Sequence, residues 1–315
     1  MIISVNTFYK NIFHKKVYKI SLDAGCTCPT RDGTLATGGC IFCSAAGSGE
    51  FTANHVEEKS WGSAYSESDG QENKNRRPVR EQVEKAKAVV SRKSGKDAAA
   101  YIAYFQSFTN TYGDIEKLYT QWKEALDCDD IAGIAIATRP DCLSDECLKK
   151  LGELAEETFV QVELGLQTSN DTIAKRIRRG YDTAVYLEAV SRLHKINPKI
   201  HVVSHIIFGL PEESRESMLQ TVKTAVSAGT DGIKIAELYV LKGTELYKEY
   251  EEGNYFPLSM EEYFSLLKKA LPLIPEKVVV HRLTGDPPKS LLAAPQWPCN
   301  KKLVLNQLNK LISAY

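Results

Sequence analysis

Residues 99–106 read AAYIAYFQ, residues 131–137 read IAGIAIA, and the segment at 115–126 between them reads IEKLYTQWKEAL. The two outer runs are short and apolar, which is typical of buried strands. The middle segment repeats apolar residues at three- and four-residue spacing, which is typical of a helix with one buried face. A strand, a helix and a second strand in this order predict two parallel strands joined by a helical crossover.

The same alternation continues along the chain. Further strand-like runs lie at 159–164 (FVQVEL), 202–208 (VVSHIIF) and 233–241 (IKIAELYVL), and a short strand is expected at 20–22. Helical patterns occur near residues 79–92, 145–156, 171–177, 184–193 and 217–228. Six strands are too few for a complete eight-fold barrel, so we expect an α/β fold, a partial (β/α)6 TIM-like barrel. Periodicity alone leaves a doubly wound sheet open.

The predicted domain organisation is a core at residues 15–256 and a small C-terminal α-rich extension at 257–315. The extension holds two helical patterns around an irregular segment at 281–298, and the polar stretch at 60–78 is expected to be a surface loop.

Composition places the chain among globular proteins. It has 315 residues, of which 43% are hydrophobic and 25% charged, which excludes wholesale disorder and a fibrous protein. No run approaches the roughly 18–20 apolar residues of a membrane span. The first residues, MIISVNTFYKNIFHKK, lack the features of a secretory signal, so we expect a cytoplasmic protein without membrane association. Lys plus Arg number 40 and Asp plus Glu number 40, so net charge offers no global argument for nucleic-acid binding.

Four of the eight cysteines cluster in the segment AGCTCPTRDGTLATGGCIFC at residues 24–43. Cys40 and Cys43 form a C-x2-C pair, whose spacing lets two thiolates face one metal centre. Glycines between Cys28 and Cys40 allow the loop to fold back, so that Cys28 joins the pair. A closed four-cysteine zinc site that includes Cys26 is one interpretation, although C-x-C is an unusual zinc spacing. The other is an iron–sulfur cluster held by three cysteines, with one iron open to a ligand.

The segment resembles the radical S-adenosylmethionine (SAM) superfamily, whose common motif is C-x3-C-x2-C with an aromatic residue before the last cysteine. Here the first gap is widened to eleven residues. This resembles the branch that includes the Elongator catalytic subunit and the bacterial YhcC/YtqA-type proteins. By that resemblance Cys28, Cys40 and Cys43 are the cluster ligands. Cys26 stands where an aromatic residue is usual, and its role stays open.

Other motifs of the branch recur over roughly residues 15 to 310. They are YFQSFTNTY at 104–112, VELGLQT at 162–168 followed by RRGYD at 178–182, HIIFGLPE at 205–212, LKGTELY at 241–247 and GNYFP at 253–257. The resemblance implies a radical SAM barrel, a [4Fe-4S] cluster and SAM as cofactors. In that family the reduced cluster cleaves SAM, and the resulting 5′-deoxyadenosyl radical abstracts hydrogen from a substrate inside a dry site.

With the resemblance in place, roles can be assigned to polar residues near strand ends, where parallel α/β folds bind ligands. Gln106 and Ser107 are expected to accept from the SAM ammonium group. Glu163 and Gln167 are expected to bond the ribose or methionine part, and Arg179 to pair with the SAM carboxylate. His205 is expected to face the nucleoside. Each has a structural alternative: strand-end caps for the glutamines, a solvated helix end for Arg179 and a core histidine for His205.

The resemblance also suggests the substrate, the C5 side chain of the tRNA wobble uridine, remodelled from carboxymethylaminomethyl to aminomethyl. Basic clusters at residues 74–96, at residues 175–179 and around Arg282 and Lys301 would bind phosphates. An electron donor such as flavodoxin or ferredoxin is the second expected partner. The alternatives are a radical SAM enzyme for a small metabolite or a protein, and a non-catalytic RNA-binding or scaffold protein with structural zinc.

Overall fold

The computed structural model describes residues 2–52, 77–94 and 100–313. Its centre is a seven-stranded sheet in the order β1-β2-β3-β4-β5-β6-β8, with all neighbours parallel. The strands are β1 (Val17–Leu22), β2 (Ala100–Phe105), β3 (Ile131–Thr138), β4 (Phe159–Gln167), β5 (His201–Phe208), β6 (Gly232–Glu237) and β8 (Val279–Arg282). The order never reverses, whereas a doubly wound sheet does so at its switch point. The predicted partial barrel is therefore confirmed, with one strand more than expected.

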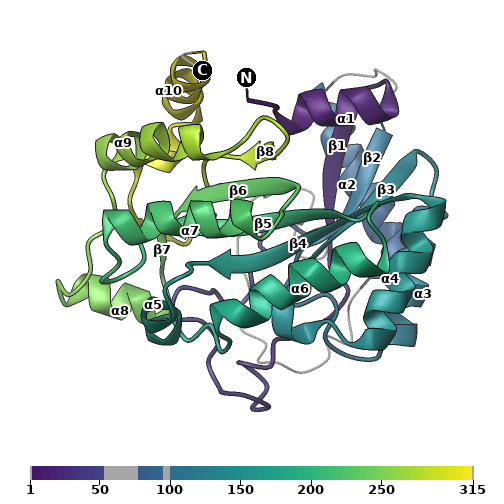
Figure 1. Cartoon of the computed structure of the whole chain (residues 1–315), viewed down its shortest axis with the longest axis horizontal. Coiled ribbons are helices and arrows are strands. Elements are labelled where there is room, and N and C mark those ends of the chain that lie inside the picture. Colours follow the sequence, from purple (N-terminus) through teal and green to yellow (C-terminus); the bar gives the residue numbers. More distant parts are fainter. Residues whose placement is uncertain (1, 53–76, 95–99, 314–315) are drawn as a thin grey trace.

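Helices connect the strands and cover the outer face of the curved sheet (Figure 1). They are α2 (Val79–Ser94), α3 (Ile115–Leu126), α4 (Asp145–Glu157), α6 (Thr183–Ile196), α7 (Arg215–Ser227) and α9 (Met260–Ala270). Two short helices, α5 (Asp171–Arg176) and α8 (Glu245–Glu251), contribute to a second apolar cluster, and α10 (Lys301–Ile312) follows the last strand. Trp122 of α3, Leu151 of α4 and Tyr263 of α9 are fully buried in the core between helices and sheet. Burying one such leucine contributes about 1.5–3 kcal/mol.

Capping side chains set where these helices begin. Asp114, Ser144 and Ser214 each accept a backbone N–H from the first turn of α3, α4 and α7. Ser259 and Glu262 form a reciprocal capping box at the start of α9. These caps satisfy N–H groups that have no partner within the helix. The bounds expected for α3 from periodicity match the structure, and those for α4 differ by one residue.

The C-terminal part differs from the sequence expectation. The run predicted as one strand at 233–241 is two, β6 and the short β7 (Val240–Leu241), and β7 pairs antiparallel with β9 (Leu292–Ala294). The segment expected to be irregular begins within β8, which adds a seventh strand beside β6. A four-residue strand is too short to show a period, and it forms here because β6 presents an unpaired edge.

A helix that periodicity did not indicate, α1 (Val5–Phe13), packs against β1 and β8. Its Phe8 and Tyr9 contact Phe159 and His281 through their rings, at the strand ends opposite the cysteine loop. The barrel interior is thereby closed at the amino ends of its strands. Of the polar loop predicted at 60–78, only residues 77 and 78 lie within the described part. No helix among the described residues is both long and apolar enough to span a bilayer.

Candidate active site

A cavity of about 800 Å³ opens at the carboxyl ends of the strands. Its wall includes alternate residues of several strands, whose side chains share one face of the sheet, together with intervening residues such as Ile20, Ile206 and Ile235. The inward set comprises Lys19 and Ser21 of β1, Tyr104 of β2, Glu163, Gly165 and Gln167 of β4, His205 and Ile207 of β5, and Lys234 and Ala236 of β6. The volume lies in the range typical of small-molecule and cofactor sites.

The cysteine loop follows β1 and forms one wall of this cavity. Cys28, Cys40 and Cys43 all line it, whereas Cys26 is not among the lining residues and packs against the core. The Cys28 Sγ lies 2.9 Å from the Thr109 Oγ1 of the loop after β2. The Cys43 backbone N–H donates to the Cys40 carbonyl at 3.0 Å, closing a tight turn around the C-x2-C pair. The structure thus brings together the three cysteines expected to act as ligands.

Arg31 holds the two ends of this loop together, a role that the sequence analysis missed. Its Nη2 donates to the carbonyl oxygens of Cys43 at 3.0 Å and Ser44 at 2.5 Å. Gly39 has a left-handed φ of 74°, and a Cβ there would come within 2.8 Å of the Arg31 Nε. A glycine is therefore required where the loop folds back, as expected from the spacing.

The donor set suits an iron–sulfur cluster. Three cysteine thiols from one loop face one cavity that also has room for a further ligand. Burial raises the pKa of Cys28 to about 11 and of Cys40 to about 12, so positive charge entering the site favours the thiolates that bind iron. Among the described residues, no three His, Cys, Asp or Glu side chains converge on a single-ion site. Cys28, Cys40 and Cys43 would hold a cluster, which is larger than one ion and does not require such convergence.

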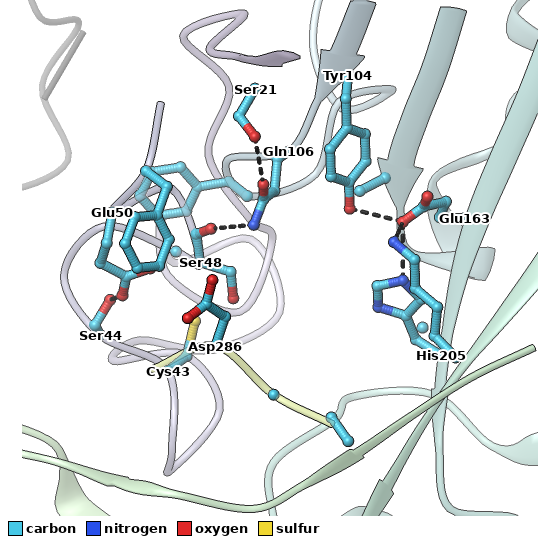
Figure 2. A pocket seen from close by; sticks show the side chains of 18 of the residues that line it. Ser21, Cys43, Ser44, Ser48, Glu50, Tyr104, Gln106, Glu163, His205 and Asp286 are labelled. Carbon is cyan, nitrogen blue, oxygen red and sulfur yellow. Dashed lines mark hydrogen bonds and ion pairs between the residues drawn. The ribbon is translucent and has the colours of Figure 1, made fainter. Parts of the chain in front are cut away.

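Gln106 and Ser107 occupy different positions relative to the cavity. Gln106 lines it, its Oε1 accepting from the Ser21 hydroxyl at 3.0 Å and its Nε2 donating to the Ser48 carbonyl at 2.8 Å (Figure 2). Ser107 is fully buried beneath Gly49 and is not a lining residue, and its Oγ has no hydrogen-bond partner among the described residues. Gln106 therefore joins the cysteine loop to β1, and Ser107 lies behind the cavity wall.

Arg179 is buried and donates to backbone carbonyls. Its guanidinium donates to the carbonyl oxygens of Leu166 at 2.6 Å, Thr168 at 2.5 Å and Tyr181 at 2.9 Å, and lies 3.2 Å from Asp171. It ties the end of β4 to the loop that follows α5, although it also lines the cavity. A role in positioning this loop is what these contacts support, and its predicted pairing with the SAM carboxylate stays a prediction.

Gln167 and Tyr181 stand at the same end of β4. Gln167 adopts a left-handed φ of 56°, and its Oε1 lies 3.4 Å from the Tyr181 hydroxyl. Two guanidinium groups pack on the Tyr181 ring, that of Arg139 at 4.9 Å and that of Arg179 at 4.6 Å from its centre. All four side chains line the cavity, so this edge is polar and cationic.

Glu163 lies at the centre of a network inside the barrel. Its Oε1 accepts from Lys19 at 2.5 Å and from Gln161 at 2.5 Å, and its Oε2 accepts from Tyr104 at 2.6 Å and from His205 at 2.9 Å. Figure 2 shows Tyr104 and His205 both pointing at this carboxylate. Lys234 also donates to the Oε2. The carboxylate predicted to bond SAM is thus already occupied by five side-chain donors, about the capacity of its lone pairs.

The electrostatics of this network follow from its burial. Burial opposes ionisation of Glu163, but Lys19 and Lys234 hold its pKa well below the usual range. Burial also lowers the pKa of Lys234 to about 7, against the attraction of Glu163. Burial and the charge of Lys234 lower the pKa of His205, so its ring is neutral at pH 7 and donates to Glu163 through Nε2.

Several of these residues were missed by sequence reasoning. Lys19 and Lys234 are the main ones, and each is a charged residue inside an apolar strand, VYKISL and GIKIAE. A charged residue within an apolar strand sequence indicates a functional or paired position, because a buried charge needs a partner or a ligand. Arg139 directly follows the carboxyl end of β3 and Tyr181 belongs to the RRGYD motif at 178–182, but the sequence assigned neither a role in the site.

A parallel half-barrel sheet with a three-cysteine loop at the carboxyl ends of its strands is typical of radical SAM proteins. Comparison of the sequence with known families gives the same result. The chain belongs to the radical SAM superfamily: the superfamily model matches residues 34–225, and the radical SAM C-terminal domain matches residues 230–313. The family implies a [4Fe-4S] cluster and SAM, and the chain is a radical SAM enzyme.

Among curated proteins, the chain is 43% identical to the uncharacterized protein YtqA of Bacillus subtilis, covering 98% of this chain and 88% of that protein. It is 32% identical to protein YhcC of Escherichia coli, covering 96% and 89%. A tRNA uridine(34) acetyltransferase of Methanocaldococcus infernus is 28% identical over 50% of this chain and 29% of that protein. The solved structure of Elp3 from the same archaeon aligns with a TM-score of 0.62 at 22% identity, covering 74% of this chain and 59% of that one, which shows a shared fold.

Proposed function

We propose that this radical SAM enzyme modifies the C5 side chain of the wobble uridine in tRNA, converting carboxymethylaminomethyl to aminomethyl. Half of the chain is similar to proteins named for tRNA uridine(34). The motifs that suggested this branch, such as VELGLQT at 162–168, lie in β4 and its loop beside the cavity.

The observation that carries the proposal is the charge of the cavity. The lining cations are Lys19, Arg31, Lys85, Arg92, Arg139, Arg179, Lys234, Arg282 and Lys301, and the lining acids are Glu50, Glu163, Glu237 and Asp286. The whole chain is electrically balanced, so this excess of cations is a local property of the site. A cationic cavity attracts an anionic substrate such as RNA.

The basic cluster predicted at residues 175–179 contributes only Arg179 to this charge. Arg176 pairs with Glu212 and Glu249, and Arg178 pairs with Glu245. Of the cluster at 74–96, residues 74–76, 95 and 96 lie outside the described residues, while Lys85 and Arg92 of α2 line the cavity. We propose that RNA approaches along α2 and the C-terminal residues that also line the opening.

When bound, the cluster and SAM supply hydrogen-atom abstraction from the substrate, and the cluster requires one electron from a donor such as flavodoxin or ferredoxin. The residues of this chain position the reactants. Cys28, Cys40 and Cys43 would hold the cluster, and Gln106 and Gln167 face the space beside it for SAM. Closure of the barrel by α1 keeps water from entering at the opposite end.

Nucleoside mass spectrometry of tRNA from a strain lacking the gene tests this function. We expect carboxymethylaminomethyluridine to accumulate and aminomethyluridine to disappear. Expression of the wild-type chain should restore the product, and the Cys43→Ala chain should not. An unchanged nucleoside profile would reject the proposal and favour a small metabolite or a protein as the substrate.

A further inference from the structure

Two cationic residues are register neighbours across the last two strands of the sheet. Lys234 of β6 pairs with Arg282 of β8, and both line the cavity. Adjacent strands lie about 4.8 Å apart, so both side chains can reach one small ligand. Two cations placed side by side repel each other unless an anion lies between them.

The ammonium group of Lys234 has protein contacts on one side only. Its ammonium donates to Glu163 and lies 4.9 Å from the centre of the Tyr104 ring. Among the described residues Glu163 is its only hydrogen-bond acceptor, and an ammonium has three donors. The side chain is 15% exposed, and its exposed part faces the cavity. It therefore has donors left for a ligand.

Arg282 is less constrained. Its side chain is 45% exposed, and the nearest carboxylate oxygen, on Asp286, is 3.8 Å away, beyond hydrogen-bond distance. Asp286 is bound more closely by Lys301, at 2.9 Å. Glu237, the other acid nearby, accepts from the Gly285 N–H and the Thr284 hydroxyl, and burial raises its pKa. The guanidinium fork of Arg282 is thus available, and its geometry matches a carboxylate.

We propose that Lys234 and Arg282 form a binding subsite for a carboxylate group of the substrate. The proposal rests on the proposed function, in which the substrate side chain ends in a carboxymethyl group. The depth of Lys234 in the cavity distinguishes a substrate carboxylate from an RNA phosphate as the ligand. Lys234 lies three residues before the carboxyl end of β6, about 10 Å below the edge where the cysteine loop lies. A side chain extending from a base reaches that depth, and a backbone phosphate does not.

SAM also carries a carboxylate, so the test must distinguish binding of the SAM carboxylate from binding of the substrate carboxylate. Three anticodon stem-loops carry carboxymethylaminomethyluridine, its methylaminomethyl analogue without the carboxylate, or unmodified uridine. Their dissociation constants are measured with the wild-type holoenzyme, Lys234→Met, Arg282→Gln and the control Lys289→Met, an exposed lysine outside the cavity. SAM affinity is measured for the same four proteins.

We expect the wild-type protein and Lys289→Met to bind the carboxylate-bearing stem-loop about tenfold more tightly than the analogue, which corresponds to about 1.4 kcal/mol. Lys234→Met and Arg282→Gln should abolish that preference, with SAM affinity unchanged. A preference retained in both variants overturns the proposal, as does a parallel loss of SAM affinity, which would assign the pair to SAM. Arg282 is outside the Glu163 network, so its variant remains informative if Lys234→Met does not fold.

A small probe distinguishes failure of this proposal from failure of the proposed function. Binding of N-methylglycine and of its amide to the holoenzyme is compared by ligand-observed NMR at millimolar concentration. If no stem-loop binds but N-methylglycine binds in preference to its amide, and Lys234→Met loses this preference, the carboxylate subsite stands and the tRNA substrate is rejected. If the acid and the amide behave alike, the subsite is rejected whatever the stem-loops show.

Discussion

The Lys19 Nζ lies 2.5 Å from the Glu163 Oε1, although 144 residues separate them in the chain. Lys19 stands on β1 and Lys234 on β6, and both reach the same carboxylate on β4 across the barrel interior. The Tyr104 ring lies 4.9 Å from each ammonium. One buried anion therefore organises two cations on widely separated strands.

Glu163→Gln should destabilise the protein by about 3–5 kcal/mol at pH 7, because it leaves the mostly buried Lys19 ammonium without a counter-charge and removes the hydrogen-bond acceptor of Lys234. Denaturant unfolding measures the change. Glu156→Gln is the matched control, since Glu156 pairs with Lys199 at an exposed position and should change stability little. The pKa of Glu163 is lowered in the folded state, so its contribution is complete above its ordinary pKa of about 4.3 and is lost as pH falls through the folded value. The difference between wild type and Glu163→Gln should therefore shrink in acid. A variant as stable as wild type would contradict this account of the network.

Cys28→Ala, Cys40→Ala and Cys43→Ala should each lose bound iron and SAM cleavage, whereas Cys26→Ala should keep both. Only the first three line the cavity. Iron content and the visible absorbance of anaerobically reconstituted protein measure the outcome. Iron lost from Cys26→Ala but retained by Cys28→Ala would show that the ligand assignment is wrong.

Arg179→Ala and Gln167→Asn should separate loop positioning from cofactor binding. Arg179→Ala leaves three backbone carbonyls without their donor and should lower the free energy of unfolding by about 3 kcal/mol or more. Gln167→Asn shortens the side chain but tolerates the left-handed backbone, so it should keep stability and weaken SAM binding with iron content intact. Thermal unfolding and SAM titration give the two readings. Normal stability of Arg179→Ala with weakened SAM binding would instead support its pairing with the SAM carboxylate.

The preference for a carboxylate-bearing stem-loop should decrease as pH rises through about 7, because the pKa of Lys234 in the protein is about 7 and its charged form binds the anion. Glu163, Lys19, Tyr104, His205 and Arg282 are the groups that face it. The pKa is lowered for Glu163 and His205 and raised for Lys19 and Tyr104, in each case away from 7. Lys234→Arg keeps a charge at all these pH values and should remove the dependence. A preference that stays constant from pH 6 to 9 in the wild type would contradict the assignment.

Binding of tRNA should weaken steeply with salt, with a slope of roughly 0.7–0.9 in log affinity for each phosphate contacted. Substituting Arg76, Arg77 and Arg80 together by alanine should lower tRNA affinity and leave SAM cleavage without substrate unchanged. Arg76 lies outside the described residues, Arg77 lies two residues before α2, and Arg80 lies in its first turn. Filter binding over a salt series measures the slope. An unchanged slope in the triple variant would place the RNA on another surface.

Local sequence determined much of the fold. A strand, a helix and a strand are specified by the apolar runs around residues 100–105 and 131–138 and by the periodic segment between them. The N-cap residue Asp114 fixes the position at which α3 begins. The cysteine spacing and the glycines at 38 and 39 likewise predicted a loop that folds back, because backbone freedom and chain length set its reach. These are short-range properties, and a single sequence carries them.

Long-range pairing decided the rest. β8 forms because β6 leaves an edge, and it brings Arg282 beside Lys234, across 48 residues of chain that show no sign of the contact. Arg179, predicted to meet a ligand, instead meets carbonyls that only the folded end of β4 presents. Glu163 could be recognised from the sequence as a carboxylate in need of partners, but its five donors come from five different strand positions. Burial and charge pairing depend on what the whole barrel encloses, and therefore only the tertiary structure determines them.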